Sequence, residues 1–166
     1  MMCFTVIIQT DFLEQMERDA FLFFWEQTNA STGLVKDRGF SNGSSNNNPV
    51  ASIACTGFSL SALVIAAENG FMDYKVLEER ALITLRFVLH NLTSVHGFYY
   101  HFVDMNTGER AWACELSSID TALLLCGVLT ARQYFKENKE IYDLATQIYD
   151  NVDWTWLPRS RYLARR

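Results

Sequence analysis

Basic residues are scarce in this sequence, and a membrane-spanning run is missing. The 166 residues include 14 Lys and Arg against 19 Asp and Glu, which gives a net charge of -5 and an isoelectric point near 5.1. A nucleic-acid-binding surface needs a basic stripe, and this balance argues against one. No run of 18 uncharged apolar residues occurs, so we expect neither a nucleic-acid partner nor a membrane span.

Metal-binding motifs of cysteine and histidine are also missing. The four cysteines contain no C-x-x-C pair, and the three histidines show no H-x-x-x-H spacing. Cys55 and Cys126 lie in apolar stretches, where an unpaired cysteine behaves as a small hydrophobic residue, so we expect both in the core. We therefore predict no metal ion and no cofactor.

The first ten residues, MMCFTVIIQT, lack the basic start, long apolar centre and cleavage site of a signal peptide. They are consistent with the stub of a removed export signal or with an arbitrary start, and the residues do not separate the two. We treat residues 1–10 as a stub that precedes the folded domain.

The sequence contains enough apolar residues to form one domain with a hydrophobic core. Hydrophobic residues make up 49% of the chain and aromatic residues 14%. The first predicted helix opens at an Asp11 N-cap with Glu14 as its capping-box partner. Helical periodicity predicts five helices, over residues 11–28, 53–69, 74–91, 118–135 and 139–152.

The predicted helices alternate between two kinds. Those at 53–69 and 118–135 are apolar or small on nearly every face, whereas the other three are amphipathic. This alternation predicts two layers, with buried helices inside and amphipathic helices outside. In the first helix, the apolar face is predicted to hold Phe12, Met16, Ala20 and Phe23.

Two segments break the helical pattern. Residues 29–50 are rich in Gly, Asn and Ser and should form a long loop, which in a compact domain is usually functional or disordered. Residues 97–112 change to an aromatic and β-branched pattern around Asn106 and Gly108, which predicts a small β-hairpin between two helices.

Five stretches resemble, in the same order, the glucoamylase-like glycoside hydrolases, the family that contains bacterial endo-β-1,2-glucanases. They are FLFFWEQTNASTGLVKDR, SIACTGFSLSAL, TLRFVL, HGFYYHFVDMNTGERAWACELSSIDTALLLCG and VDWTW. The resemblance implies an all-α fold, the (α/α)6 toroid, in which inner and outer helices alternate around a central pocket. A complete toroid has twelve helices and we predict five, so we expect an incomplete toroid at residues 11–156. The basic tail at 157–166 has no counterpart in the family.

The resemblance also implies a chemistry. We expect a carbohydrate-active domain of an exported bacterial protein that hydrolyses β-glucan, with β-1,2 linkages favoured, by an inverting mechanism with two carboxylates. Its partner is then an oligo- or polysaccharide. We expect the second carboxylate beyond Arg166, so the chain should be inactive alone, and the exposed edge of a half-toroid should favour self-association. A non-catalytic carbohydrate-binding or structural remnant is the alternative. Terpene cyclases, which also use helical toroids, need Asp-rich motifs that this sequence lacks.

Two acids in the segment WACELSSIDT are the catalytic candidates. Glu115 precedes the fourth helix, and partial burial beside Trp112 would raise its pKa, as a general acid requires. A solvated glutamate, or one paired with Arg110, is the alternative. Asp120 is explained by an N-cap at Ser117, which places this acid in the first helical turn, and a substrate-facing role is the lesser possibility.

Sugar-binding candidates lie in the long loop and the hairpin. Asp37 and Arg38 match a family segment, where an ion pair that organises the loop competes with contacts to sugar hydroxyls. Tyr99 and His101 share one strand face, and aromatic rings with polar edges suit sugars, although core packing competes. His101 is expected to bind hydroxyls or to orient a carboxylate. The predicted substrate-binding residues are Asp37, Arg38, Tyr99, His101, Arg110 and Trp112.

Three neighbouring residues are assigned structural roles instead. For Tyr100 and Phe102, two aromatic residues of the predicted hairpin, we prefer core packing to sugar binding. Asp104 opens the hairpin turn and is expected to be a turn residue.

Overall fold

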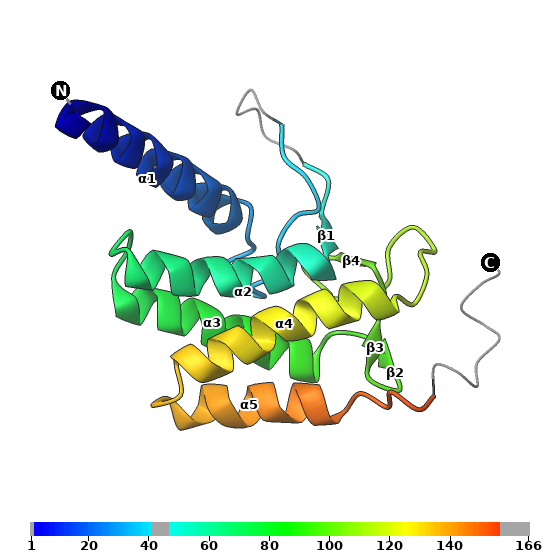
Figure 1. Cartoon of the computed structure of the whole chain (residues 1–166). Helices are drawn as coiled ribbons and strands as arrows, with labels where there is room; N and C mark the ends of the chain where they lie inside the picture. Colours follow the sequence, from blue (N-terminus) through cyan, green and yellow to red (C-terminus); the bar gives the residue numbers. More distant parts are fainter. Residues whose placement is uncertain (1, 41–46, 157–166) are drawn as a thin grey trace.

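The computed structural model describes residues 2–40 and 47–156, the first ten of these by their backbone alone, and it is mostly helical (Figure 1). Its helices and strands are α1 (Met2–Glu26), β1 (Val50–Ser52), α2 (Ile53–Glu68), α3 (Tyr74–His90), β2 (Ser94–Val95), β3 (Phe98–Tyr99), β4 (Phe102–Asp104), α4 (Ser118–Tyr134) and α5 (Lys139–Asp150). The short strands gather at one end of the helical layers. The predicted all-α class is confirmed.

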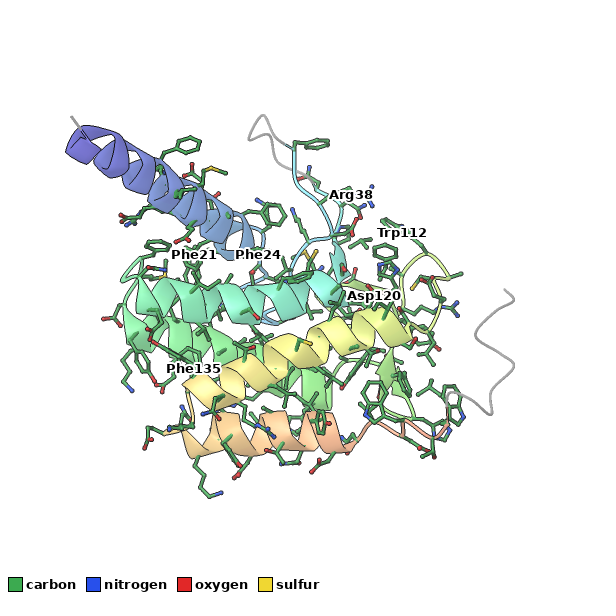
Figure 2. All side chains as sticks on the ribbon, in the orientation of Figure 1. Phe21, Phe24, Arg38, Trp112, Asp120 and Phe135 are labelled. Carbon is green, nitrogen blue, oxygen red and sulfur yellow. The ribbon has the colours of Figure 1, made fainter. Side chains whose placement is uncertain are left out.

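α1 is longer than predicted and packs only near its end. The helix begins at Met2 and continues through Asp11, so the predicted N-cap is wrong; residues 2–10 contain neither Gly nor Pro to interrupt the helix. Phe12 and Met16, predicted to face inward, are 63% and 52% exposed, and Phe21 is the buried residue. The reason is the course of α1, which leaves the other helices at an angle and keeps Phe21 and Phe24 beside α2 (Figures 1 and 2).

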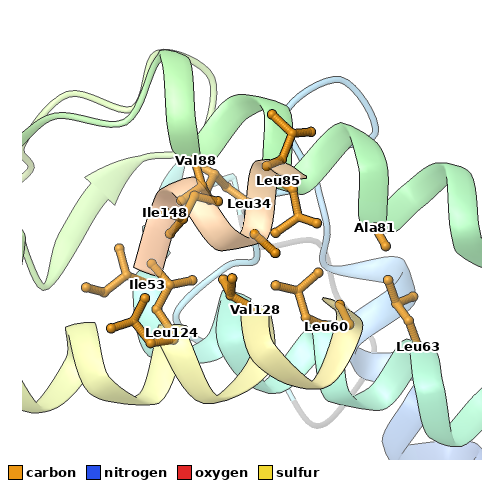
Figure 3. Close-up of a cluster of buried hydrophobic side chains, with 14 of the residues drawn as sticks. Leu34, Ile53, Leu60, Leu63, Ala81, Leu85, Val88, Leu124, Val128 and Ile148 are labelled. Carbon is orange, nitrogen blue, oxygen red and sulfur yellow. The ribbon is translucent and has the colours of Figure 1, made fainter. Parts of the chain in front are cut away.

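α2 and α4 form the inner layer and cross at a pair of glycines. A Cβ atom on Gly127 would lie 1.9 Å from the carbonyl oxygen of Gly57, which is closer than any side-chain carbon can approach. Beside the crossing, Leu60 and Val128 are fully buried (Figure 3). The two helices predicted to be buried are thus the pair at the centre.

α3 and α5 form the outer layer, and each turns one apolar face toward the inner pair. Leu85 of α3 and Ile148 of α5 are fully buried there (Figure 3). On the exposed side, the Arg86 guanidinium donates to both carboxylate oxygens of Glu140 over 2.7 and 2.8 Å, which joins the two outer helices. The predicted alternation of inner and outer helices is confirmed.

One apolar face of each inner helix is exposed. Phe58 and Ile65 lie seven residues apart on α2 and are about half exposed. Ile119 and Cys126 have the same spacing on α4 and are also exposed. The predicted core position is therefore wrong for Cys126, because this face of α4 is not covered. Cys55 is half-buried.

The predicted hairpin around Asn106 and Gly108 is present, because the Asp104 N–H donates to the Glu109 carbonyl over 2.8 Å and Val103 forms an antiparallel bridge with Arg110. The chain does reverse after β4, where the Gly108 N–H donates to the Asp104 carbonyl over 2.8 Å and the Asp104 carboxylate accepts from the Asn106 N–H over 2.8 Å. Asp104 is thus a turn residue, as predicted. On its other side β4 pairs with β1, with Ser52 opposite Phe102, and β2 and β3 form a separate hairpin. This β1–β4 pairing joins two segments that are distant in the chain.

Three further predictions concern the chain ends and the membrane. The segment predicted as a stub belongs to α1 over residues 2–10. The predicted basic tail at 157–166 lies outside the described residues. Within the described ranges, no helix combines the length and the apolar character that crossing a membrane requires.

Candidate functional site

Several of the predicted site residues meet at the strand end of the helices. The Asp37 N–H donates to the Val50 carbonyl over 3.1 Å, and β1 then pairs with β4, so the long loop lies beside residues 101–104. Residues 110–117 lead from there into α4. Figure 2 shows Arg38, Trp112 and Asp120 at this end of the molecule.

Asp120 is anchored in the first turn of α4. Ser117 is the N-cap: its hydroxyl oxygen accepts from the Asp120 N–H over 3.2 Å, and its hydroxyl donates to Asp120 Oδ2. The Asp120 side chain is largely buried. The predicted capping arrangement is confirmed, and it holds this carboxylate in one orientation.

The imidazole of His101 lies between the two candidate acids. Its Nδ1 is 3.1 Å from Glu115 Oε1, and its Nε2 is 3.7 Å from Asp120 Oδ1. The ring stacks on Phe102 with 3.7 Å between centroids. The His101 N–H donates to the Glu115 carbonyl over 3.1 Å, and the His101 carbonyl accepts from the Ile53 N–H over 3.2 Å. Two acids that the sequence left unrelated are therefore linked through one ring.

Within the described part of the chain, these three residues also form a cluster of side chains of the kinds that can bind a metal ion. His101, Glu115 and Asp120 each offer a ligand atom, and these atoms lie within 4.8 Å of one another. The two ring nitrogens face different acids, so a single ion would require the ring to give up one of these contacts. As it stands, the arrangement is an acid–imidazole–acid chain.

Glu115 is more exposed and more acidic than predicted. Its side chain is 56% exposed. A hydrogen bond from its own backbone N–H is the main cause that lowers its pKa; His101 and Arg110 lower it further, while partial burial opposes them. The predicted rise in pKa is wrong for this chain, because hydrogen bonding and positive charge outweigh burial.

Trp112 lies on a strained turn and is exposed. Trp112 and Ala113 have φ values of 54° and 51°, which residues other than glycine rarely adopt. Arg110 holds the turn, because its guanidinium donates to the Ala113 carbonyl over 2.6 Å and lies over the Tyr100 ring. Trp112 is 58% exposed and packs against Phe102, with 5.1 Å between ring centroids. The turn therefore presents a large aromatic surface to solvent.

The structure removes Tyr99 from the predicted sugar-binding residues. Tyr99 is 3% exposed, and burial raises its pKa to about 12, so its ring belongs to the core. Tyr100 packs against the core, as predicted. Phe102 does not, because its ring lies against both His101 and Trp112. The sequence contained no signal for Phe102 as a site residue, because an aromatic residue in a strand is equally typical of core packing.

Asp37 and Arg38 form an ion pair in the long loop. The Arg38 Nε donates to Asp37 Oδ2 over 2.5 Å, and the arginine is exposed while the aspartate is mostly covered. Cys55 lies next to this loop, with its Sγ 3.9 Å from the Asp37 carbonyl oxygen. Burial is the main cause that raises the pKa of the Cys55 thiol, and the charges of Asp37 and Asp120 add to it. Cys55 therefore lies between the loop and α4, a position that its sequence context does not reveal.

Comparisons with known proteins agree with this arrangement. No protein-family model matches the sequence. The exo-β-1,2-glucooligosaccharide sophorohydrolase (non-reducing end) of Parabacteroides distasonis is 29% identical over 153 residues, which are 87% of this chain and 20% of that protein. The chain therefore spans about a fifth of the length of this curated relative.

Solved structures share the fold. A β-1,2-glucanase from Parabacteroides distasonis matches 91% of this chain and 22% of its own, with a TM-score of 0.76 and 26% identity. An endo-β-1,2-glucanase from Chitinophaga pinensis, in complex with sophorotriose and glucose, matches 87% of this chain and 37% of its own, with a TM-score of 0.74 and 24% identity. The predicted resemblance to glucoamylase-like glycoside hydrolases is confirmed for part of their fold.

Proposed function

We propose that this chain forms part of the sugar-binding and proton-transferring end of a β-glucan hydrolase, with β-1,2 linkages favoured. The observation that carries the proposal is the Glu115–His101–Asp120 chain at the same end of the molecule as the exposed Trp112. The names of the bacterial relatives support the choice of substrate. Export from the cell is part of the same proposal, because a glucan polymer is too large to cross the cell membrane intact.

Glu115 is the proposed proton donor. Inversion needs two carboxyl groups about 6.5–9.5 Å apart, one to protonate the leaving oxygen and one to activate water. Oxygens of Glu115 and Asp120 lie within 4.8 Å of each other, with the His101 ring facing both, which is closer than the separation that inversion requires. We therefore assign the second carboxylate to a residue outside the described part of the chain. A sugar covering Glu115 would exclude water and raise its pKa toward that of an acid.

The groups around Glu115 suit a sugar. The Trp112 ring offers an apolar surface to the C–H face of a pyranose. Asp37 and Arg38 offer charged hydrogen-bonding groups to its hydroxyls. Arg110 already bonds to the turn, so we assign it to holding Trp112 rather than to binding sugar.

Binding of short β-1,2-linked glucans by the 166-residue chain tests the proposal. We expect saturable binding by isothermal titration calorimetry, and W112A should weaken it roughly tenfold, because it removes the stacking surface. W154A is the matched control, since Trp154 is also partly exposed but packs on Phe98 of β3. Absence of binding, or equal affinity for β-1,4-linked glucans, would contradict the proposal.

A non-catalytic sugar-binding role is the second candidate, and the lowered pKa of Glu115 favours it. Release of reducing sugar from β-1,2-glucan measures whether this chain hydrolyses the sugar or only binds it. Since we assign the second carboxylate elsewhere, we expect this chain to bind glucan with little or no hydrolysis. Hydrolysis that disappears in a folded E115Q variant would show that the chain is sufficient, and the assignment of the second carboxylate would then be wrong.

A further inference from the structure

We infer that Arg110 is a positioning residue, which holds Trp112 on a strained turn that is already formed before sugar binds. The inference rests on the proposed role of Trp112 as the surface on which a sugar stacks. The strain of the turn is then compensated during folding, so a sugar meets a ring that is already in place.

The turn protrudes because one segment is longer than the segment with which it pairs. Antiparallel bridges join the two segments at two places, Val103 with Arg110 and Tyr100 with Leu116. Two residues lie between the bridged positions on the first segment, and five lie between them on the second. The longer segment has to bend outward to fit, and Trp112 lies at this bend, where it is exposed to solvent (Figure 2).

The bend is a type I′ turn made of residues that do not favour it. The Cys114 N–H donates to the Ala111 carbonyl over 3.2 Å, which closes a four-residue turn. Its two central residues, Trp112 and Ala113, both have positive φ, as in type I′. Asn and Gly favour these positions, whereas Trp and Ala do not. Contacts from outside the turn must therefore stabilise it.

Phe102 fixes the two ends of the turn. Its carbonyl oxygen accepts from the Ala111 N–H over 2.9 Å and from the Cys114 thiol over 3.2 Å. Its own N–H donates to the Cys114 sulfur, also over 3.2 Å. These contacts determine where the turn begins and ends, and the tip between them requires support of its own.

Arg110 supplies this support. Its guanidinium donates to the Ala113 carbonyl over 2.6 Å. The same guanidinium lies over the Tyr100 ring, 4.7 Å from its centroid, and Tyr100 packs against the core. Rotation of Ala113 to a negative φ would turn its carbonyl away and break the hydrogen bond. Arg110 therefore opposes the relaxation of the two strained residues.

The hold on the turn has a consequence for affinity. A sugar that stacks on Trp112 binds only those molecules in which the turn is formed. When a fraction of the molecules has the competent conformation, the apparent affinity falls by that fraction. Arg110 thus acts on binding through Trp112, without touching the sugar.

Calorimetry with short β-1,2-linked glucans and the 166-residue chain separates this role from direct binding of sugar by Arg110. We expect R110A to weaken binding about fivefold, which is less than the effect of W112A. In the W112A background, R110A should cause no further loss. A113G favours a positive φ, so R110A/A113G should bind within about twofold of A113G alone. A loss that arises from the charge of Arg110 near Glu115 would instead persist in both backgrounds.

The turn can also be observed by NMR without sugar. The three-bond coupling between the amide and Hα protons of Trp112 reports its φ, and R110A should move this coupling toward that of a negative φ. The other amide signals show whether the fold is intact. R132A is the matched control, because Arg132 also lies over a tyrosine ring, that of Tyr142, and donates to the Thr146 hydroxyl. It should change neither the coupling nor the affinity.

Two results would overturn the inference. One is an unchanged coupling of Trp112 in folded R110A, and the other is a loss of affinity that persists in the W112A and A113G backgrounds. If the wild-type chain binds no glucan but R110A still releases the turn, the proposed function is wrong and the positioning of Trp112 by Arg110 is confirmed.

Discussion

Glu115 and Asp120 carry the same chemical group in one short segment, yet their surroundings differ. Asp120 is buried and bonded to the cap hydroxyl of Ser117, so it belongs to the framework of α4. Glu115 is exposed and bonded to His101, so it is accessible to a ligand. At the residue scale, neighbouring donors rather than sequence position determine what each acid can do.

Loss of the cap of α4 should cost more stability than loss of the cap of α3. The exposed Asp73 accepts only from backbone amides, those of Lys75 and Val76, so D73A should lower the free energy of unfolding by about 1 kcal/mol. Ser117 also donates to the buried Asp120, so S117A should cost roughly 2–3 kcal/mol. Urea unfolding measures both values, and equal losses would show that the buried contact adds nothing.

The buried phenol of Tyr99 should make stability fall in strong base. Burial raises its pKa to about 12 in the folded chain, from about 10 when unfolded. The neutral phenol therefore contributes fully below about pH 10, and roughly 2–3 kcal/mol is lost as the pH rises through 12. Unfolding of the wild-type chain and Y99F at increasing pH should show this difference, with Y142F as a surface control. If the two stabilities stay parallel up to pH 12, the buried phenol is not responsible.

At the scale of elements, the contact between α2 and α4 depends on glycine. G127A would place a Cβ atom 1.9 Å from the Gly57 carbonyl oxygen, and both neighbours are backbone that cannot move aside. We expect a loss of about 3 kcal/mol or more, measured by thermal or urea unfolding. G70A is the control, because a Cβ at Gly70 meets nothing within 4 Å and only its φ of 64° is unfavourable. Its cost should be about 1 kcal/mol; a similar value for G127A would mean that the helices can separate.

The short strands determine which loops meet at the site, just as the glycines determine how closely the inner helices pack. β1 ends at Ser52, which caps α2, and its pairing with β4 holds the long loop against the His101 segment. This pairing helps to bring Asp37 and Asp120 close to Cys55, where the charges of both raise the pKa of the thiol. The helices thus form the framework, and the short strands select which loops meet.

At the scale of the whole molecule, apolar surface remains open along α1 and α2. The two helices border a groove of about 270 Å³, with Phe21 and Phe24 on one side and Phe58 and Ile65 on the other. We propose that a second copy of the chain covers this surface, because exposed apolar patches favour association. Light scattering should show concentration-dependent dimers that the double variant F58K/I65K abolishes. Y149K on α5 should leave them intact, and a wild-type chain that stays monomeric would contradict the proposal.

The helices, their alternation and the resemblance to the glucoamylase-like family could all be predicted from the order of residues. Apolar periodicity and capping are local properties, so the inner helices and the Ser117 cap with Asp120 could be predicted from residues that are near neighbours in the chain. Local signals also explain the errors. Asp11 resembles a cap, but nothing upstream interrupts the helix, and Cys126 lies in an apolar stretch whose face happens to be uncovered.

Which residues share the site depends on contacts that form when the chain folds. The pairing of β1 with β4, the burial of Tyr99 and the meeting of Glu115 and Asp120 at His101 all join segments that no periodicity connects. The lowered pKa of Glu115 is of the same kind, because it reflects the sum of a hydrogen bond, two positive groups and partial burial in one place. Contacts between segments that are distant in the chain bring these groups around Glu115, so the lowered pKa could not be predicted from the order of residues.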